Sequence, residues 1–131
     1  TIHADFFPDN AFFTGDTFTG AIDFYFACSG LLAYDLAVCI NAWGFSANGV
    51  FSLPHSSALI AGYQSLRPLE EREIEALPIL ARGAAMRFFL TRLIDWSETP
   101  GDAQVRPKDP LDYAARLEFH RTASDANAYG I

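Results

Sequence analysis

The sequence predicts a mainly α-helical fold with one short β-hairpin near its start, and three observations lead to this fold class. Two β-favouring apolar stretches, residues 11–13 and 18–22, flank a turn-forming tetrapeptide at 14–17. Beyond the hairpin, apolar residues recur at helical spacing. The chain has 131 residues, of which 50% are hydrophobic, so it can bury a core of its own.

Two helices are expected directly after the hairpin. Residues 31–43 carry apolar side chains on one face, with Asp35 as their only charge. A connection rich in Gly, Asn and Ser follows. The second helix is expected from residue 54 or 55 to residue 65, because Pro68 disfavours helical backbone just before it.

Three further helical segments are expected in the second half of the chain. The acids of residues 70–75 favour a helix start, where the macrodipole stabilises negative charge, and Pro78 is expected to break or kink this helix. The longest helix is expected at 79–97 and a final one at 110–122, whereas 123–131 has the composition of a loose tail. The expected stop and start signals are Thr99-Pro100-Gly101-Asp102 and Asp109. The long helix is expected to supply the core with Phe88, Phe89, Leu90 and Leu93.

The candidate catalytic and metal-binding residues lie near the start of the chain. Residues 3–10, HADFFPDN, have the form H-x-D-x-x-x-x-N, and Asp23 follows the hairpin. Phosphotransferases use this layout because phosphoryl transfer needs an Asp to orient the acceptor hydroxyl, and an Asn and a second Asp to hold Mg²⁺. A hairpin returns the chain, so Asn10 and Asp23 can converge on one ion. We predict Asp5 as the catalytic base and Asn10 and Asp23 as Mg²⁺ ligands; the structural alternative is that each caps a turn.

Two more residues are expected to support this loop. His3 has the residue type of a metal ligand or of a nucleophile's partner, but no other His lies near it in the sequence and no G-x-S-x-G elbow exists here. We therefore favour a structural role through ring hydrogen bonds. Asp35 is an acid at an apolar helix start, where a buried charge needs partners. It either caps the helix or accepts backbone N–H groups of the loop, and we favour the loop.

Substrate contacts are predicted from residue chemistry alone. Arg82, Arg87 and Arg92 recur every five residues, a spacing that does not form one helical stripe. One of them is expected in a surface ion pair, for instance Arg92 with Asp95 at i,i+3. An amino-acid substrate needs a cation for its carboxylate, and an Arg can bind it through two hydrogen bonds, so we predict Arg87 for that role. Tyr25, just after the second Asp, is the other predicted contact.

The charge distribution excludes one class of partner. Residues 1–66 contain five acids and no Lys or Arg, and all nine basic residues lie from Arg67 onward. A nucleic-acid partner would need a basic stripe, so none is expected. No apolar run approaches the roughly 20 residues of a membrane span. Cys28 and Cys39 lack metal-binding spacing and lie in an apolar stretch, which indicates buried free thiols of a cytoplasmic protein.

Beyond these motifs, the chain resembles the homoserine kinases of the choline-kinase-like type, in the aminoglycoside phosphotransferase superfamily. The blocks that carry the resemblance are residues 3–10, 22–28 (IDFYFAC), 34–37 (YDLA), 41–43 (NAW), 61–65 (AGYQS), 82–93 (RGAAMRFFLTRL), 95–96 (DW) and 107–111 (PKDPL). The first block is common to the superfamily, and the later ones are more specific to homoserine kinases. Ala4 stands where protein kinases have Arg.

The resemblance implies ATP-dependent phosphorylation of the side-chain hydroxyl of L-homoserine, in threonine biosynthesis, with ATP and Mg²⁺ as cofactors. It implies a protein-kinase-like α+β fold of two lobes, of which residues 1–131 are the C-terminal helical lobe. In that lobe, 1–27 form the catalytic loop and metal-binding hairpin, 28–122 the helical subdomain and 123–131 the tail. The nucleotide Lys and the N-terminal lobe are expected outside this chain, so we expect the chain alone to be inactive.

Alternative functions stay open at this point. A related kinase could act on choline or ethanolamine, a methylthio sugar or an aminoglycoside; a choline site would need an aromatic cage and an aminoglycoside site many acids. A non-catalytic kinase-like interaction domain is the alternative from another class. The intact set of Asp5, Asn10 and Asp23 argues against it.

Overall fold

The computed structural model describes residues 1–100, 104 and 106–131. In this part of the chain it contains four α-helices and a two-stranded antiparallel hairpin, which confirms the predicted mainly helical fold class. The elements are β1 (Ala11–Thr14), β2 (Thr17–Ala21), α1 (Leu32–Trp43), α2 (Leu53–Leu66), α3 (Glu71–Glu98) and α4 (Leu111–Thr122), with 3₁₀ turns η1 (Pro8–Asn10), η2 (Phe24–Phe26) and η3 (Ala126–Tyr129). None of the described helices is both long and apolar enough to cross a membrane.

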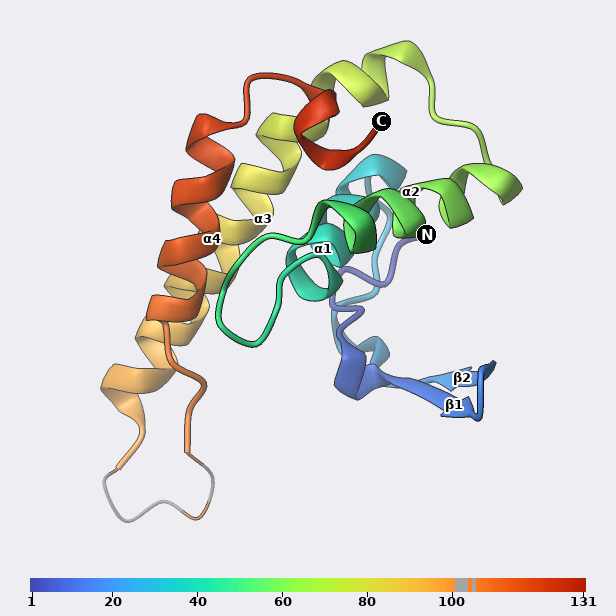
Figure 1. Cartoon of the computed structure of the whole chain (residues 1–131). Coiled ribbons are helices and arrows are strands. Elements are labelled where there is room, and N and C mark those ends of the chain that lie inside the picture. The colour runs from blue at the N-terminus through green and yellow to red at the C-terminus, as the bar shows by residue number, and fades with distance from the viewer. Residues whose placement is uncertain (101–103, 105) are drawn as a thin grey trace.

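Helix α3 organises the molecule. Figure 1 shows α4 lying along its lower part and the hairpin projecting from the helices as an arm; α1 packs against α3, and α2 packs against α1. Apolar side chains are buried where α1 packs against the neighbouring helices. One cluster joins α1, α2, α3 and the C-terminal segment, and a second joins α1, α3 and α4. The second cluster is built from Val38, Ala84, Ala85, Phe88 and Tyr113, with Phe7 of the N-terminal loop packed against it.

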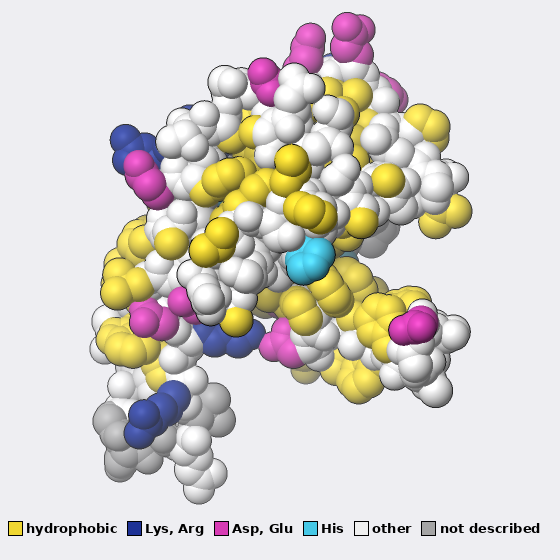
Figure 2. Space-filling view, viewed as in Figure 1, with side chains coloured by type: hydrophobic (Ala, Val, Ile, Leu, Met, Phe, Trp, Pro, Cys, Tyr) yellow, Lys and Arg dark blue, Asp and Glu magenta, His cyan; other side chains and the backbone are white. Residues whose placement is uncertain are grey.

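The hairpin forms where the sequence predicts it. Gly15 occupies the turn with φ +58°, a conformation that glycine adopts without steric cost. The pairing shifts by one residue after Phe12, so Thr19 is the extra residue of a β-bulge. Three aromatic side chains of the arm are about half exposed: Phe12, Phe13 and Phe18. Figure 2 shows hydrophobic surface on the arm.

Pro78 kinks a helix and does not break it. The expected helices at 70–77 and 79–97 form the single helix α3, and Figure 1 shows its axis changing direction after the first turns. Proline removes one backbone N–H and crowds the preceding turn. Leu77 and Pro78 are both buried, so packing holds the helix together across the bend. Its end at Glu98 agrees with the predicted stop at Thr99; Gly101 and Asp102 lie outside the described residues.

The last nine residues are not a loose tail, and this prediction is wrong. Ala123, Ala126 and Tyr129 are buried. Asp125 accepts a hydrogen bond from the backbone N–H of Asn127 at 2.9 Å and caps η3. The Ser57 hydroxyl of α2 donates to the carbonyl of Gly130 at 3.0 Å. Contacts with residues distant in sequence therefore order a segment whose own composition favours disorder.

Two burial predictions are also corrected. Cys28, whose backbone forms an isolated bridge with Ile2, is exposed, whereas Cys39 is mostly buried; both thiols are free. Leu90 and Leu93 are 48% and 44% exposed, although both were expected in the core. Of the four residues expected in the core, Phe88 is buried and Phe89 half-buried.

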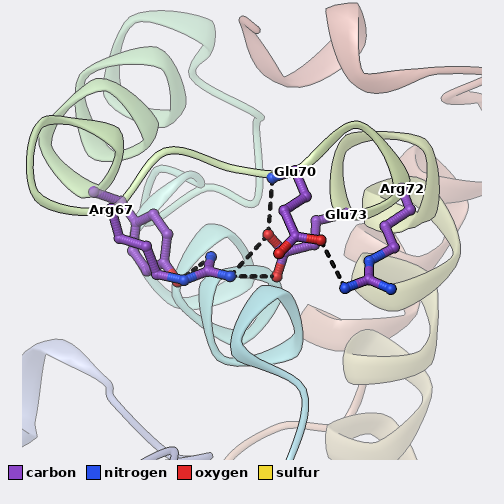
Figure 3. A network of polar contacts seen from close by, with 5 residues as sticks. Arg67, Glu70, Arg72 and Glu73 are labelled. Carbon is purple, nitrogen blue, oxygen red and sulfur yellow. Dashed lines mark hydrogen bonds and ion pairs between the residues drawn. The ribbon is translucent and has the colours of Figure 1, made fainter.

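A polar network fixes the connection between α2 and α3 (Figure 3). Arg67 donates to both carboxylate oxygens of Glu73, at 2.9 and 3.0 Å, and to the hydroxyl of Tyr63. Glu73 also accepts a hydrogen bond from the backbone N–H of Glu70. The side chain three positions into α3 thus satisfies a backbone donor at the helix start, as in a capping box.

Candidate functional site

The N-terminal loop is held in an unusual backbone conformation by Asp35. Ala4 has φ +62°, in the left-handed region that non-glycine residues rarely adopt. The two carboxylate oxygens of Asp35, in the first turn of α1, accept hydrogen bonds from the N–H groups of His3 at 3.0 Å and Ala4 at 2.7 Å. These are the hydrogen bonds that the sequence led us to expect of Asp35. The helix end itself has no side-chain cap.

His3 connects the loop to the end of the hairpin. Its Nδ1 accepts a hydrogen bond from the N–H of Asp5 at 3.3 Å, and its Nε2 lies 2.9 Å from the carbonyl oxygen of Ile22. A neutral ring with the proton on Nε2 satisfies both contacts. The ring therefore fixes the backbone on either side of the site, at Asp5 and just before Asp23.

Asn10 and Asp23 lie at the two ends of the hairpin. The amide nitrogen of Asn10 donates to the carbonyl of Asp5 at 2.8 Å, and the carbonyl of Asn10 accepts from the N–H of Ile22 at 3.1 Å. Asn10 is 9% exposed, and its side-chain oxygen has no hydrogen-bond partner among the described residues. Asp23 follows Ile22 with φ +64° and is exposed. The hairpin thus brings Asp5, Asn10 and Asp23 together, as the spacing predicts.

These residues line a cavity of about 310 Å³ between the loop and helix α3. The loop side carries Asp5, Asn10 and Asp23, and α3 faces them with Arg87, Thr91 and Asp95. The remaining wall consists of Phe7, Asp9, Phe26, Phe88, Arg92 and Lys108. Figure 2 shows this side of the molecule hollowed between the hairpin arm and the helices, with basic and acidic side chains in the hollow.

The carboxylates of the loop have different electrostatic surroundings. Burial raises the pKa of Asp5 above its ordinary value; the guanidinium of Arg87 opposes this shift and the neighbouring Asp23 carboxylate adds to it. Asp9 has a lowered pKa, chiefly because Lys108 donates a 2.9 Å hydrogen bond to it. Asp5 is therefore the loop carboxylate with the greater affinity for a proton, as a base requires.

Comparison with known proteins decides the family. The model of the phosphotransferase enzyme family matches residues 1–69, which include the loop, the hairpin and Asp35. The chain belongs to this family. The resemblance to homoserine kinases is confirmed as well. The chain is 62% identical over 130 residues to a homoserine kinase of Azorhizobium caulinodans, with 99% of this chain and 40% of the relative covered.

Two more relatives carry the name homoserine kinase. A homoserine kinase of Hyphomonas neptunium is 62% identical over 137 residues, covering 99% of this chain and 42% of the relative. One of Agrobacterium fabrum is 57% identical over 130 residues, covering 99% and 40%. The chain therefore spans about 40% of the length of the curated relatives it matches.

Of the two predicted substrate contacts, Arg87 lies at the cavity and Tyr25 does not. Arg87 lines the cavity; it donates to the carbonyl of Ala4 at 2.6 Å and lies over the rings of Phe26 and Phe88, at 5.0 and 4.5 Å. Tyr25 is 94% exposed and outside the cavity wall, because the 3₁₀ turn η2 directs its neighbour Phe26 inward.

The other two arginines of the series lie elsewhere. Arg82 donates to the carbonyl of His120, in α4. Arg92 pairs with Asp112 of α4 at 3.3 Å and not with Asp95, so that prediction is corrected. Packing of α4 along α3 offers Arg92 an acid from another element, which sequence spacing within one helix does not reveal.

Eight of the twelve cavity residues were not predicted as site residues; Phe26, Thr91 and Lys108 are among them. Thr91 had a detectable signal, since it lies four residues after Arg87 and shares its helix face. Lys108 had no such signal, because it contacts Asp9 of the loop, which is 99 positions away in the sequence.

A metal ion at this site would need the oxygens of Asn10 and Asp23. In the part of the chain that the structure describes, no three His, Cys, Asp or Glu side chains gather as a metal site. Mg²⁺ commonly takes only one or two protein oxygens and completes its shell with phosphates and water. The amide oxygen of Asn10 and the carboxylate of Asp23 fit that donor set.

Proposed function

We propose that this chain is the helical lobe of a homoserine kinase, which transfers the γ-phosphoryl group of ATP to the side-chain hydroxyl of L-homoserine and forms O-phospho-L-homoserine. One observation carries the proposal: Asp5, Asn10 and Asp23 meet at one cavity in a chain 62% identical to a homoserine kinase. The product is the one that threonine biosynthesis consumes, and we expect the enzyme in the cytoplasm.

Asp5 is proposed as the catalytic base. The acceptor oxygen attacks the γ-phosphorus in line, its new P–O bond forms as the bond to the bridging oxygen of ADP breaks, and Asp5 takes the hydroxyl proton. The raised pKa of Asp5 supports this role. His3 and Asp35 act only through the loop, since both hold its backbone.

Asn10 and Asp23 are proposed to hold Mg²⁺. When bound, the ion would neutralise charge on the phosphates of ATP. The hydrogen bond from the Asn10 amide nitrogen to Asp5 orients its oxygen, and the link from His3 to Ile22 fixes the backbone before Asp23. This chain thus orients the ligands through hydrogen bonds of its own.

ATP is expected to bind between this lobe and a second one. The curated relatives are about two and a half times as long as the chain, which leaves room for a lobe that supplies the nucleotide Lys. The half-exposed aromatic side chains of the hairpin arm offer that lobe an apolar surface. The division into loop and hairpin (1–27), helical subdomain (28–122) and C-terminal segment (123–131) belongs to the same proposal.

The substrate carboxylate is proposed to bind Arg87. Only one guanidinium nitrogen donates to Ala4, so other N–H groups remain for an anion. Tyr25 stays a prediction, although its exposed side chain gives it little support.

The test is ADP release by the complete protein that carries this chain, with Mg²⁺ and one acceptor at a time. We expect L-homoserine to be preferred over choline, a methylthio sugar and an aminoglycoside at equal concentration. Preference for another acceptor would replace the substrate and keep the roles of Asp5, Asn10 and Asp23. If no acceptor leads to ADP release, a non-catalytic interaction domain is favoured. The 131-residue chain alone should release no ADP.

A further inference from the structure

Helix α3 presents three chemically different side chains to the cavity. Arg87, Thr91 and Asp95 are four residues apart, so they lie on one face of the helix, and each step rises about 6 Å along the axis. A cation, a hydroxyl group and an anion therefore follow one another along the wall opposite Asp5. An α-amino acid carries an anion and a cation on one carbon atom.

Asp95 is a cavity carboxylate without an ionic partner among the described residues. Arg92, the nearest cation in sequence, donates instead to Asp112 at 3.3 Å and to the carbonyl of Asp109 at 3.2 Å. Lys108, the other cation of that wall, pairs with Asp9. Within the described part of the chain, these two cations are thus engaged elsewhere, and neither forms an ion pair with Asp95.

The position of Asp95 does not help the helix. Asp95 lies in the last turn of α3, where the macrodipole is negative and favours Lys or Arg over an acid, and this turn contains no base. Its backbone carbonyl accepts hydrogen bonds from the N–H and the hydroxyl of Thr99, which adds no positive charge. The carboxylate and the helix end together make this part of the cavity attractive to a cation.

We propose that Asp95 binds the α-ammonium group of the acceptor amino acid. The inference rests on the proposed kinase function and adds the group that recognises the amine. With the hydroxyl at Asp5, the α-carbon of homoserine lies over Thr91, its carboxylate turned toward Arg87 and its ammonium toward Asp95. Two opposite charges on one helix face then select a zwitterion over a simple alcohol.

The test compares three acceptors in the complete enzyme: L-homoserine, 4-hydroxybutyrate, which lacks the ammonium, and 3-aminopropanol, which lacks the carboxylate. Asp95→Asn should raise KM for homoserine and for 3-aminopropanol roughly 10- to 100-fold, with kcat little changed, because the lost partner is a charged hydrogen bond. KM for 4-hydroxybutyrate should not rise. Preference for homoserine over 4-hydroxybutyrate should fall by the same factor.

Glu98→Gln is the matched control. It removes a carboxylate from the same exposed helix end, one turn further on and outside the cavity wall, and should leave all three KM values unchanged. If Asp95→Asn raises KM equally for all three acceptors, or leaves all three KM values unchanged, the inference is overturned. The proposed function would still stand, because the wild-type enzyme remains active. A wild-type enzyme that phosphorylates none of them would remove the proposed function, and this inference with it.

Discussion

Arg87 donates a hydrogen bond to the backbone carbonyl of Ala4 over 2.6 Å, although 83 positions separate the two residues in sequence. Ala4 precedes Asp5 and carries the strained φ of the loop. Arg87 is clamped in turn by the rings of Phe26 and Phe88. One side chain of α3 thus contacts the loop backbone and partly offsets the effect of burial on the pKa of Asp5.

Replacing Arg87 should change the pH dependence of turnover. The guanidinium lowers the pKa of Asp5, so Arg87→Gln removes that effect and the pKa rises further above its ordinary value. A base must be ionised, and activity is lost as pH falls through its pKa; the acid limb of kcat/KM should therefore move to higher pH. Arg121→Gln, at a surface ion pair with Glu118, is the control. An unmoved acid limb in Arg87→Gln would contradict the coupling.

Asp5→Asn should lower kcat by roughly 10²- to 10⁴-fold, which is the usual contribution of a positioned base. Nucleotide affinity should change little, since the amide keeps the size of the side chain. Steady-state kinetics and ATP binding separate the two effects. The matched variant is Asp9→Asn, four residues along the same loop, whose exposed ion pair with Lys108 is expected to matter little. Near-normal turnover by Asp5→Asn would remove Asp5 from the base role.

Asp35→Asn should loosen the loop. An amide keeps one acceptor oxygen and turns an NH₂ group toward a backbone N–H donor, so one of the hydrogen bonds to His3 and Ala4 is lost. We expect a loss of about 1–3 kcal/mol in the free energy of unfolding and faster hydrogen exchange at these two amides. Glu71→Gln, an exposed acid at the start of α3, is the control. Unchanged exchange at both amides would show that Asp35 does not hold the loop.

The parts of the site that the sequence predicted are those whose geometry is local. The spacing from His3 to Asn10 and the turn at Gly15 are local, and Asp5, Asn10 and Asp23 do line one cavity. Their catalytic and metal-binding roles stay predictions. The parts that it missed depend on distant elements. Lys108 reaches Asp9 across 99 positions, and no local pattern encodes that contact.

The same distinction explains the errors in the fold. Pro78 is a strong local signal for a break, yet burial of Leu77 and Pro78 keeps α3 continuous. The last nine residues have no helical or strand pattern, and only contacts such as that of Ser57 with Gly130 order them. Local propensity is a weak guide where tertiary packing supplies the free energy.

His120 should make the stability of the protein depend on pH. It is fully buried: its Nδ1 faces the hydroxyl of Tyr129 and its Nε2 the side-chain oxygen of Asn41, both at 3.0 Å. The amide nitrogen of Asn41 already donates to the carbonyls of Ala37 and Ala81, so its oxygen accepts the proton of a neutral ring. Burial, with Arg82 and Arg116 nearby, lowers the pKa of His120 from 6.5 to about 4.

Because the folded pKa lies below the unfolded one, the unfolded chain binds a proton that the folded chain does not between about pH 4 and 6.5. Stability should therefore fall on acidification, by about 2 kcal/mol between pH 7 and 5 from this residue. Urea unfolding at the two pH values measures the loss. It should shrink in His120→Gln and persist in His55→Gln, whose histidine is exposed. Ring chemical shifts in the wild type give a second check: titration of His120 near its ordinary pKa would refute the buried neutral ring.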